Sequence, residues 1–510
     1  MARKEAGTGK PELKKTGIEG LDDVLGGGLS PGRCFLLEGN PGTGKTTIAT
    51  QFLLEGRAAG EKGLYITLSE TEDELRESAA SHGWLLEGIE IFELIPPENL
   101  LDEEQQQSLL YSSDLELGET TKRIFGAFER LKPDRVVLDS LSEIRLLAQS
   151  SLRYRRQILA LKHYFAKQSA TVLLLDDLTA DASDKTVHSV AHGVLRLEEL
   201  SPDYGAERRR VRVIKYRGQP FRGGYHDFTI RTGGVSVFPR LVSAEHKAVF
   251  RHEILSTDNA EMNALMGGGV ERGSSVLVLG PAGAGKSFLA MSFIASAARR
   301  GEKSALFIFD EERGLLIRRM KALNIDLQDM IDKELVFLTQ VDAAELTPGE
   351  FSQQVRSCID KGAKTIVVDS LNGYQAAMPE ERALILHMHE LLQYCNRQGA
   401  TTFLTVAQHG LMGDMKAPVD LTYLADTVVL LRYFEAYGRV RRAISLVKKR
   451  TSAHEDTIRE YMIDGHGLTL GEPLVNFQGV LRGVPMVMGE GPELLRDGPK
   501  ESQSEKSARI

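Results

Sequence analysis

Two segments of the 510-residue chain fit the pattern GxxxxGK[ST], in which glycines let backbone amides close around phosphate oxygens. Each segment follows a continuously apolar run and precedes a helix-like stretch, as phosphate binding at a helix N-terminus requires. The lysine of such a loop reaches the β and γ phosphates of a nucleotide. The residues predicted to bind nucleotide are Gly39, Asn40, Pro41, Gly42, Thr43, Gly44, Lys45, Thr46 and Thr47, and then Gly280, Pro281, Ala282, Gly283, Ala284, Gly285, Lys286, Ser287 and Phe288.

Four oxygen-bearing side chains are candidates for holding Mg²⁺ beside these loops. The hydroxyls of Thr46 and Ser287 follow the loop lysines. Asp139 and Asp369 each end an apolar strand, where a carboxylate can act on the ion through water. A strand-terminal Asp can also simply cap the next turn, but its recurrence after both loops favours the metal role. We therefore expect a nucleotide with β and γ phosphates, together with Mg²⁺, as the bound species.

Acidic residues recur at one distance from the loops. Glu70 and Glu311 each lie 25 residues after the loop lysine, and Asp310 precedes Glu311 where Ser69 precedes Glu70. A carboxylate facing the γ-phosphate can orient or deprotonate the attacking group. Such residues are also often just solvated. The predicted catalytic residues are Glu70, Asp310 and Glu311.

Basic residues recur in a K-x-R register late in each half of the chain. Lys215 and Arg217 form the first pair, and Lys448 and Arg450 the second. A cation that reaches a neighbouring subunit's γ-phosphate stabilises developing charge and can raise turnover by roughly 10³–10⁵. Basic residues at strand ends are commonly surface charges, yet the repetition favours the trans-acting role.

The order of these motifs is the same in both halves, which indicates a tandem duplication. Within each half, apolar strand-like runs alternate with amphipathic helix-like stretches. This alternation predicts an α/β fold with a mostly parallel sheet covered by helices on both faces. We expect a disordered N-terminal arm over residues 1–13, a first domain over 14–243, a second over 244–478 and a polar C-terminal tail over 479–510.

Composition excludes several classes of protein. Hydrophobic residues make up 42% and charged residues 26%, as in ordinary globular domains, and no run is long enough to span a membrane. The N-terminus lacks the apolar core of a signal peptide, so a cytoplasmic location is expected. Cys34, Cys358 and Cys395 are too few and too scattered for a disulfide framework or a zinc site. The net charge of −8 argues against a dedicated DNA-coating protein.

The stretch TGIEGLDDVLGGGLSPG, the doubled loops, the VDS strand and the K-x-R strands resemble the KaiC family of RecA-like ATPases over about residues 14–478. The resemblance implies tandem RecA-like P-loop NTPase domains, a homo-hexameric double ring with ATP between subunits, and slow hydrolysis. In clock members it also implies Ser/Thr autophosphorylation in the second domain, and small clock- or signalling-type protein partners. Neither membrane nor nucleic-acid partners are expected.

Individual residues follow from the same resemblance. The paired acidic residues of the family fall on Ser69-Glu70 and on Asp310-Glu311, and the first of each pair is the usual general base. The Ser-Thr phosphoacceptor pair falls on Thr422 and Tyr423, which makes Thr422 the candidate phosphoacceptor. The C-terminal tail does not match the segment by which clock members bind an activating partner.

Three functions remain open at this point. The first is a hexameric signalling ATPase with Ser/Thr autokinase activity. The second is a nucleic-acid motor or recombinase, for which the best feature is a basic cluster. The third is a nucleotide-gated scaffold with little turnover, which the missing acid at Ser69 favours for the first domain only. The basic cluster, which also reads as a strand leading to Lys215, consists of Arg208, Arg209, Arg210 and Arg212.

Overall fold

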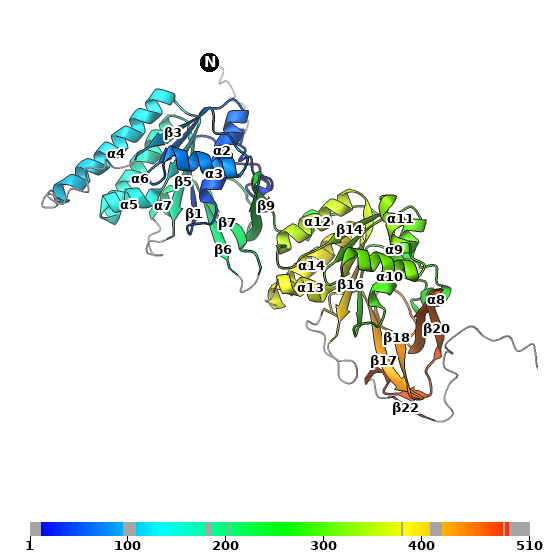
Figure 1. Ribbon diagram of the computed structural model, residues 1–510. Helices are drawn as coiled ribbons and strands as arrows, with labels where there is room; N and C mark the ends of the chain where they lie inside the picture. The colour runs from blue at the N-terminus through cyan, green and yellow to red at the C-terminus, as the bar shows by residue number, and fades with distance from the viewer. Residues whose placement is uncertain are drawn as a thin grey trace, which may run out of the picture. The chain divides into compact units, whose positions relative to one another are not determined.

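The computed structural model describes residues 12–94, 109–178, 186–201, 205–378, 381–408, 421–482 and 485–488. Most of the expected N-terminal arm and of the expected C-terminal tail lies outside these ranges. The chain divides into two compact units between Arg240 and Leu241, and these are called the first and second domain below (Figure 1). Each is described by itself.

The first domain is built on a nine-stranded sheet with the order β3-β2-β4-β5-β1-β6-β7-β8-β9. Neighbouring strands from β3 to β6 run parallel, whereas β7, β8 and β9 are added antiparallel. The strands are β1 (Cys34–Gly39), β2 (Gly63–Thr67), β3 (Ile89–Glu93), β4 (Arg135–Asp139), β5 (Thr171–Asp177), β6 (Gly193–Leu200), β7 (Arg208–Tyr216), β8 (Tyr225–Arg231) and β9 (Gly234–Phe238).

Helices cover both faces of this sheet (Figure 1). One face packs against α1 (Leu21–Val24), α2 (Lys45–Ala58) and α3 (Glu72–Ser81). The other face packs against α4 (Leu109–Leu131), α5 (Leu141–Ala148), α6 (Ser151–Lys167) and α7 (Thr186–Val190). Because β1, β2 and β4 are covered on both faces, every residue in them is buried, which explains their continuously apolar sequences.

The second domain repeats this plan with the order β14-β13-β15-β16-β12-β17-β18-β19-β20. Two short pairs, β10-β11 and β21-β22, lie outside the main sheet. The strands are β10 (Ile254–Leu255), β11 (Val270–Glu271), β12 (Ser275–Gly280), β13 (Lys303–Ile308), β14 (Val336–Gln340), β15 (Ala363–Asp369), β16 (Thr401–Ala407), β17 (Thr427–Ala436), β18 (Arg439–Lys449), β19 (Arg459–Asp464), β20 (Gly467–Pro473), β21 (Phe477–Gln478) and β22 (Met486–Val487).

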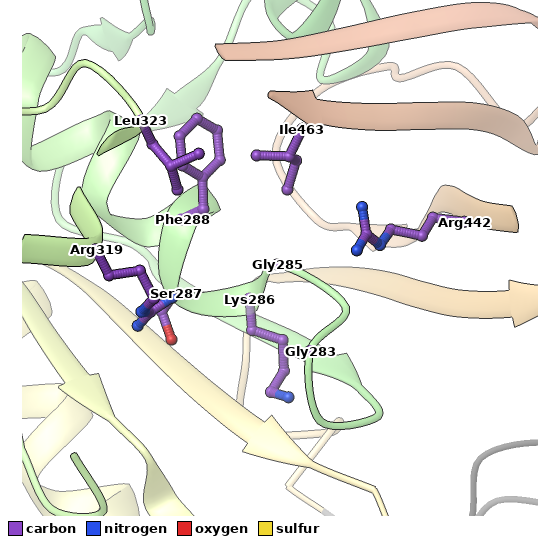
Figure 2. Close-up of a pocket in the computed structure, with 9 residues that line it drawn as sticks. All are labelled: Gly283, Gly285, Lys286, Ser287, Phe288, Arg319, Leu323, Arg442 and Ile463. Carbon is purple, nitrogen blue, oxygen red and sulfur yellow. The ribbon is translucent and has the colours of Figure 1, made fainter. Parts of the chain in front are cut away.

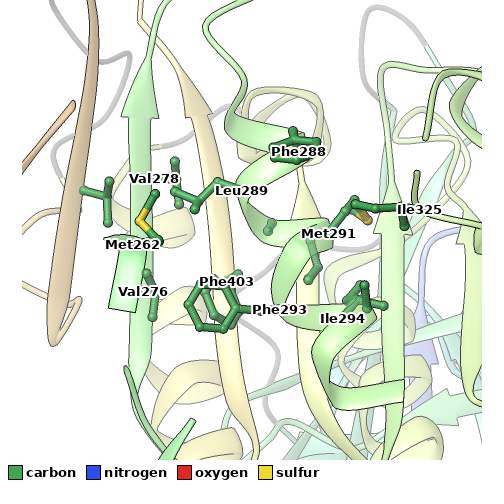
Figure 3. Close-up of a cluster of buried hydrophobic side chains, with 14 of the residues drawn as sticks. Met262, Val276, Val278, Phe288, Leu289, Met291, Phe293, Ile294, Ile325 and Phe403 are labelled. Atoms are coloured by element: carbon green, nitrogen blue, oxygen red, sulfur yellow. The ribbon is translucent and has the colours of Figure 1, made fainter. Parts of the chain in front are cut away.

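Two buried clusters hold the helices of the second domain to its sheet. In one, Phe288, Met291 and Phe293 of α9 pack onto Val276 and Phe403 of the sheet (Figure 3). The other lies on the opposite face, beneath α12, α13 and α14. The helices are α8 (Ala260–Leu265), α9 (Lys286–Arg299), α10 (Arg313–Ala322), α11 (Leu327–Asp332), α12 (Pro348–Asp360), α13 (Leu371–Ala377) and α14 (Glu381–Arg397), with 3₁₀ turns at Ser243–Glu245 and Val480–Arg482.

The expected α/β class and mostly parallel sheets with helices on both faces are confirmed in both domains. The sequence predicted a strand leading to Lys215, but not that three antiparallel strands extend each sheet. Among the described residues, none of the helices combines the length and the apolar character that crossing a membrane requires.

Candidate nucleotide-binding sites

Each GxxxxGK[ST] loop joins a buried central strand to a helix. The first loop connects β1 to α2 and the second connects β12 to α9. Gly44 (φ 95°) and Gly285 (φ 100°) stand at the helix starts in the left-handed region, and a Cβ there would also strike Ile230 or Ile463. Neither helix has a side-chain cap, so its first backbone amides are left for an anionic ligand.

The two loop lysines are both buried but are held differently. Lys45 Nζ donates to the carbonyl oxygens of Gly39 (2.8 Å) and Asn40 (3.0 Å), and it forms an ion pair with Asp177 Oδ1 at 2.7 Å. Lys286 Nζ donates to the carbonyl of Pro281 at 2.9 Å. Burial lowers the pKa of Lys286, and the nearby charge of Asp369 opposes this effect.

In the first domain, the structure brings the predicted metal residues together. Thr46 Oγ1 lies 3.3 Å from Asp139 Oδ2, which also accepts a hydrogen bond of 2.6 Å from the Tyr65 hydroxyl. Burial raises the pKa of Asp139, while Tyr65 and the charge of Lys45 oppose the rise. A hydroxyl and a carboxylate at this spacing are hard oxygen donors of the kind that Mg²⁺ prefers.

In the second domain, the predicted catalytic Asp310 lies close to the strand that carries Asp369. The hydroxyl of Ser370, the residue after Asp369, donates to Asp310 Oδ2. Asp369 itself accepts a hydrogen bond from the hydroxyl of Thr405 on β16. Within the described ranges, no three or more His, Cys, Asp and Glu side chains form a metal cluster.

Glu70 and Glu311 occupy matching positions but have different surroundings. Burial raises the pKa of Glu70, and the charges of Asp139 and Glu74 raise it further. Glu311 forms a two-point ion pair with Arg319 on α10, at 2.6 and 3.0 Å. Glu70 is thus the more available of the two to accept a proton.

A cavity of about 190 Å³ lies beside the second loop (Figure 2). Phe288, Leu323 and Ile463 give it an apolar wall, and Arg319 and Arg442 bring positive charge. Of these, sequence reasoning had identified Phe288 alone. The others come from α10 and the loop after it, from β18 and from β19, so no local pattern could have placed them together. The remaining lining residues are Gly283, Gly285, Lys286 and Ser287.

The K-x-R cations of the second domain bind the backbone of the candidate phosphoacceptor segment. Lys448 Nζ donates to the carbonyl oxygens of Thr422 (2.8 Å) and Ala425 (2.7 Å). Arg450 donates to the carbonyl of Tyr423 at 2.6 Å. The Thr422 side chain is half-buried and that of Tyr423 is exposed.

The first domain repeats this arrangement around α7. Lys215 Nζ donates to the carbonyls of His188 and Ala191, and Arg217 donates to that of Ser189 at 2.8 Å. Burial lowers the pKa of Lys215, and the adjacent charge of Arg217 lowers it further.

A β-bulge precedes the lysine in both domains. Opposite β6, Val194 pairs with Lys215 and Leu195 pairs with Val213, which leaves Ile214 as an extra residue. In β18 the extra residue is Val447, between Leu446 and Lys448. The bulge shifts the alternation of side chains just before the cations.

Two of the four arginines in the basic cluster of β7 form ion pairs with acidic neighbours. Arg209 pairs with Glu199 at 2.9 Å and Arg210 pairs with Glu198 at 2.6 Å. The guanidinium groups of Arg210 and Arg212 both lie over the ring of Tyr225. These contacts fit a structural strand better than an open surface for phosphate backbones.

Comparison with known proteins gives one family. The model of the KaiC ATPase family matches residues 14–242 and again residues 255–475. The chain is 28% identical to circadian clock protein KaiC3 of a Synechocystis strain, over 93% of this chain and 95% of that protein. It is 28% identical to the circadian clock oscillator protein KaiC of Thermostichus vulcanus, over 97% of both chains. Its identity to the Synechococcus elongatus protein of the same name is 27%, over 94% of both chains.

Proposed function

The chain belongs to the KaiC family of ATPases, and on this premise we propose that each of its two domains binds ATP with Mg²⁺ and hydrolyses it at its phosphate loop. The observation that carries the proposal is the grouping around the first loop. A buried lysine, a hydroxyl and a buried carboxylate meet at a helix N-terminus whose amides have no side-chain cap. This set matches the charges of a nucleotide triphosphate with its cation.

The chemistry divides among the residues of each site. The backbone amides of the loops hold the phosphates, and Lys45 or Lys286 neutralises the β and γ oxygens. Thr46 with Asp139, and Ser287 with Asp369, would hold Mg²⁺, which draws negative charge from the phosphates. In the second domain, Asp310 and Glu311 are the proposed carboxylates that act on the attacking group, and in the first domain Glu70 is a candidate for this role. In the second domain, we assign the adenosine part to the cavity of Phe288, Leu323 and Ile463.

We further propose that the chain forms a homo-hexameric ring and that its second domain phosphorylates Thr422. Support for the ring comes from the recurrence of the K-x-R cations in both domains, because the proposed trans action requires a partner subunit's phosphate. Support for Thr422 comes from the contacts of Lys448 and Arg450, which fix the backbone on which this hydroxyl stands. Two of the relatives named above are clock oscillator proteins, so a signalling output through small protein partners is the proposed role.

A labelled nucleotide separates these activities. Purified full-length protein is incubated with γ-labelled ATP and Mg²⁺, and the label is followed into free phosphate and into protein. We expect free phosphate from the wild-type chain, with less from Lys45→Ala and from Lys286→Ala. Label on protein should vanish in Lys286→Ala and persist in Lys45→Ala. A wild-type chain that releases no phosphate would contradict the ATPase proposal.

The ion pairs of Arg209 and Arg210 disfavour the alternative of a nucleic-acid motor. That alternative relied on the basic cluster to bind nucleic acid, and these two of its arginines are already paired with glutamates. It predicts DNA-stimulated hydrolysis that falls steeply with added salt. Hydrolysis that is independent of DNA at all salt concentrations is the result we expect.

A further inference from the structure

The two phosphate sites take a carboxylate from different strands. In the second domain Asp310 follows β13, whereas the matching residue of the first domain is Ser69. The strands that pair with β1 and β12, which lead into the two loops, show the opposite difference: the first domain has a carboxylate there and the second has none. Gly39 is in register with Asp177 of β5, whereas Gly280 is in register with Ala407 of β16. Each domain thus has a carboxylate at one of these two places and lacks it at the other.

The position of Asp177 is defined by its contact with Lys45. Its Oδ1 atom lies 2.7 Å from Lys45 Nζ, the ammonium group that serves the β and γ phosphates in such loops. A carboxylate in contact with this ammonium lies at the terminal-phosphate end of the site. The side chain of Asp177 is 28% exposed, which leaves it open to water.

We propose that Asp177 is the carboxylate that orients and deprotonates the attacking water in the first domain, in place of the acid missing at Ser69. This inference rests on the proposed ATPase function. Asp177 forms an ion pair with Lys45. Phosphate oxygens compete with Asp177 for this ammonium group, and a carboxylate displaced from it stays beside the terminal phosphate.

The step balances with water and ATP alone. The water oxygen forms a bond to the γ-phosphorus while the bond from that phosphorus to the β–γ bridging oxygen breaks. The bonding electron pair leaves with ADP, and the water proton passes to Asp177 and from there to solvent.

Glu70 does not account for the difference between the domains. Its counterpart Glu311 is present in the second domain, so Glu70 is no substitute for an acid that the first domain lacks. Asp177, by contrast, has Ala407 as its counterpart, which cannot accept a proton.

The test uses the full-length chain with Lys286→Ala, so that hydrolysis reports the first domain. Two quantities are measured: phosphate release and the Kd of a fluorescent ADP. Adding Asp177→Asn should lower phosphate release by about 10²-fold. ADP affinity should be retained or increase, because a negative charge near the phosphates is removed. Adding Ser69→Glu to Asp177→Asn should restore part of the rate. Asp73→Asn, an exposed carboxylate on α3, is the matched control and should change neither quantity.

Each other result counts against the assignment. Unchanged phosphate release in Asp177→Asn would overturn it, and so would a parallel loss of ADP affinity, which marks a structural role. A full rate in Asp177→Asn together with a loss in Glu70→Gln would assign the step to Glu70 instead. A Lys286→Ala parent that binds ADP but releases no phosphate would contradict the proposed function of the first domain itself, before Asp177 is changed.

Discussion

Lys448 Nζ lies 2.8 Å from the carbonyl oxygen of Thr422, so the cation predicted to act on a neighbouring subunit also binds its own chain. Lys215 contacts the carbonyl of His188 in the same way. The proposed action on a neighbouring phosphate would have to share the three protons of one ammonium with the carbonyls that it already binds.

The first prediction concerns the backbone that these lysines hold. Lys448→Met removes hydrogen bonds to Thr422 and Ala425 while it keeps the apolar stem. We expect amide hydrogen exchange over residues 421–426 to rise by about tenfold, since each such bond contributes roughly 1 kcal/mol. Lys215→Met is the matched control and should change exchange around His188 instead. Unaltered exchange near Thr422 in Lys448→Met would show that other contacts hold this segment.

The second prediction concerns the phosphoacceptor. Thr422→Ala should abolish the label that γ-labelled ATP transfers to protein, because it removes the hydroxyl that we assign as acceptor. Tyr423→Phe should keep the label, since the described contact of Tyr423 with Arg450 is made by its backbone carbonyl. Phosphopeptide mapping checks both. A label lost in Tyr423→Phe and kept in Thr422→Ala would move the acceptor to Tyr423.

The third prediction concerns a buried arginine at the start of β4. Arg135, 2% exposed, pairs with Glu61 at 2.5 Å and donates to the carbonyls of Lys15 and Phe52. Arg135→Ala should lower the free energy of unfolding of the first domain by about 2–4 kcal/mol, because the carbonyls of Lys15 and Phe52 lose a charged donor while Glu61 keeps its ion pair with Lys14.

Trp84, the single tryptophan of the chain, lies in the first domain and reports its unfolding by fluorescence. Arg130→Ala is the control for Arg135, since Arg130 pairs with Glu90 at the surface and should cost less than about 1 kcal/mol. Equal effects of the two substitutions on the urea midpoint would contradict the structural role of Arg135.

The fourth prediction concerns pH. His226 is buried, accepts a hydrogen bond from the Arg240 amide and lies 3.0 Å from the Arg222 carbonyl. Burial lowers its pKa from the ordinary 6.5 to about 4. Between these two values the unfolded chain binds a proton that the folded chain does not, so stability is complete above pH 6.5 and is lost as the pH falls towards 4. The loss amounts to about 3 kcal/mol.

Urea unfolding followed by Trp84 fluorescence at several pH values from 7 to 4 checks this. His226→Gln should flatten the dependence over this window, whereas His163→Gln, at an exposed position on α6, should leave it as it is. A wild-type dependence that survives in His226→Gln would assign the acid sensitivity to other groups.

The sequence predicted those features whose residues lie next to one another along the chain. The phosphate loops, the strand that ends at Asp139 and the alternation of strands and helices each occupy one stretch of chain, so their patterns could be recognised. The α/β class followed from them. The antiparallel addition of β7, β8 and β9 did not, because their half-exposed residues lack the continuous apolar pattern of the central strands. Only the strand that leads to Lys215 was predicted among them.

Contacts that depend on the order of strands in the sheet could not be predicted from the sequence. Asp177 ends an apolar run that looks like any other, and only the placement of β5 beside β1 brings it to Lys45. The same holds for Tyr65, which meets Asp139 because β2 and β4 are neighbours. The cavity residues Leu323, Arg442 and Ile463 come from three separate parts of the chain, so their grouping could be seen only in the folded structure.

The bulge at Val447 adds one residue to β18 without disturbing the pairing on either side of it. Leu446 stays opposite Val429 and Lys448 stays opposite Val428, so the extra residue is accommodated locally. Ile214 does the same between Val213 and Lys215 in the first domain. Both domains therefore reach their lysine through the same irregular step in the ladder, and the length of chain that leads to each lysine is one residue more than a regular strand would need.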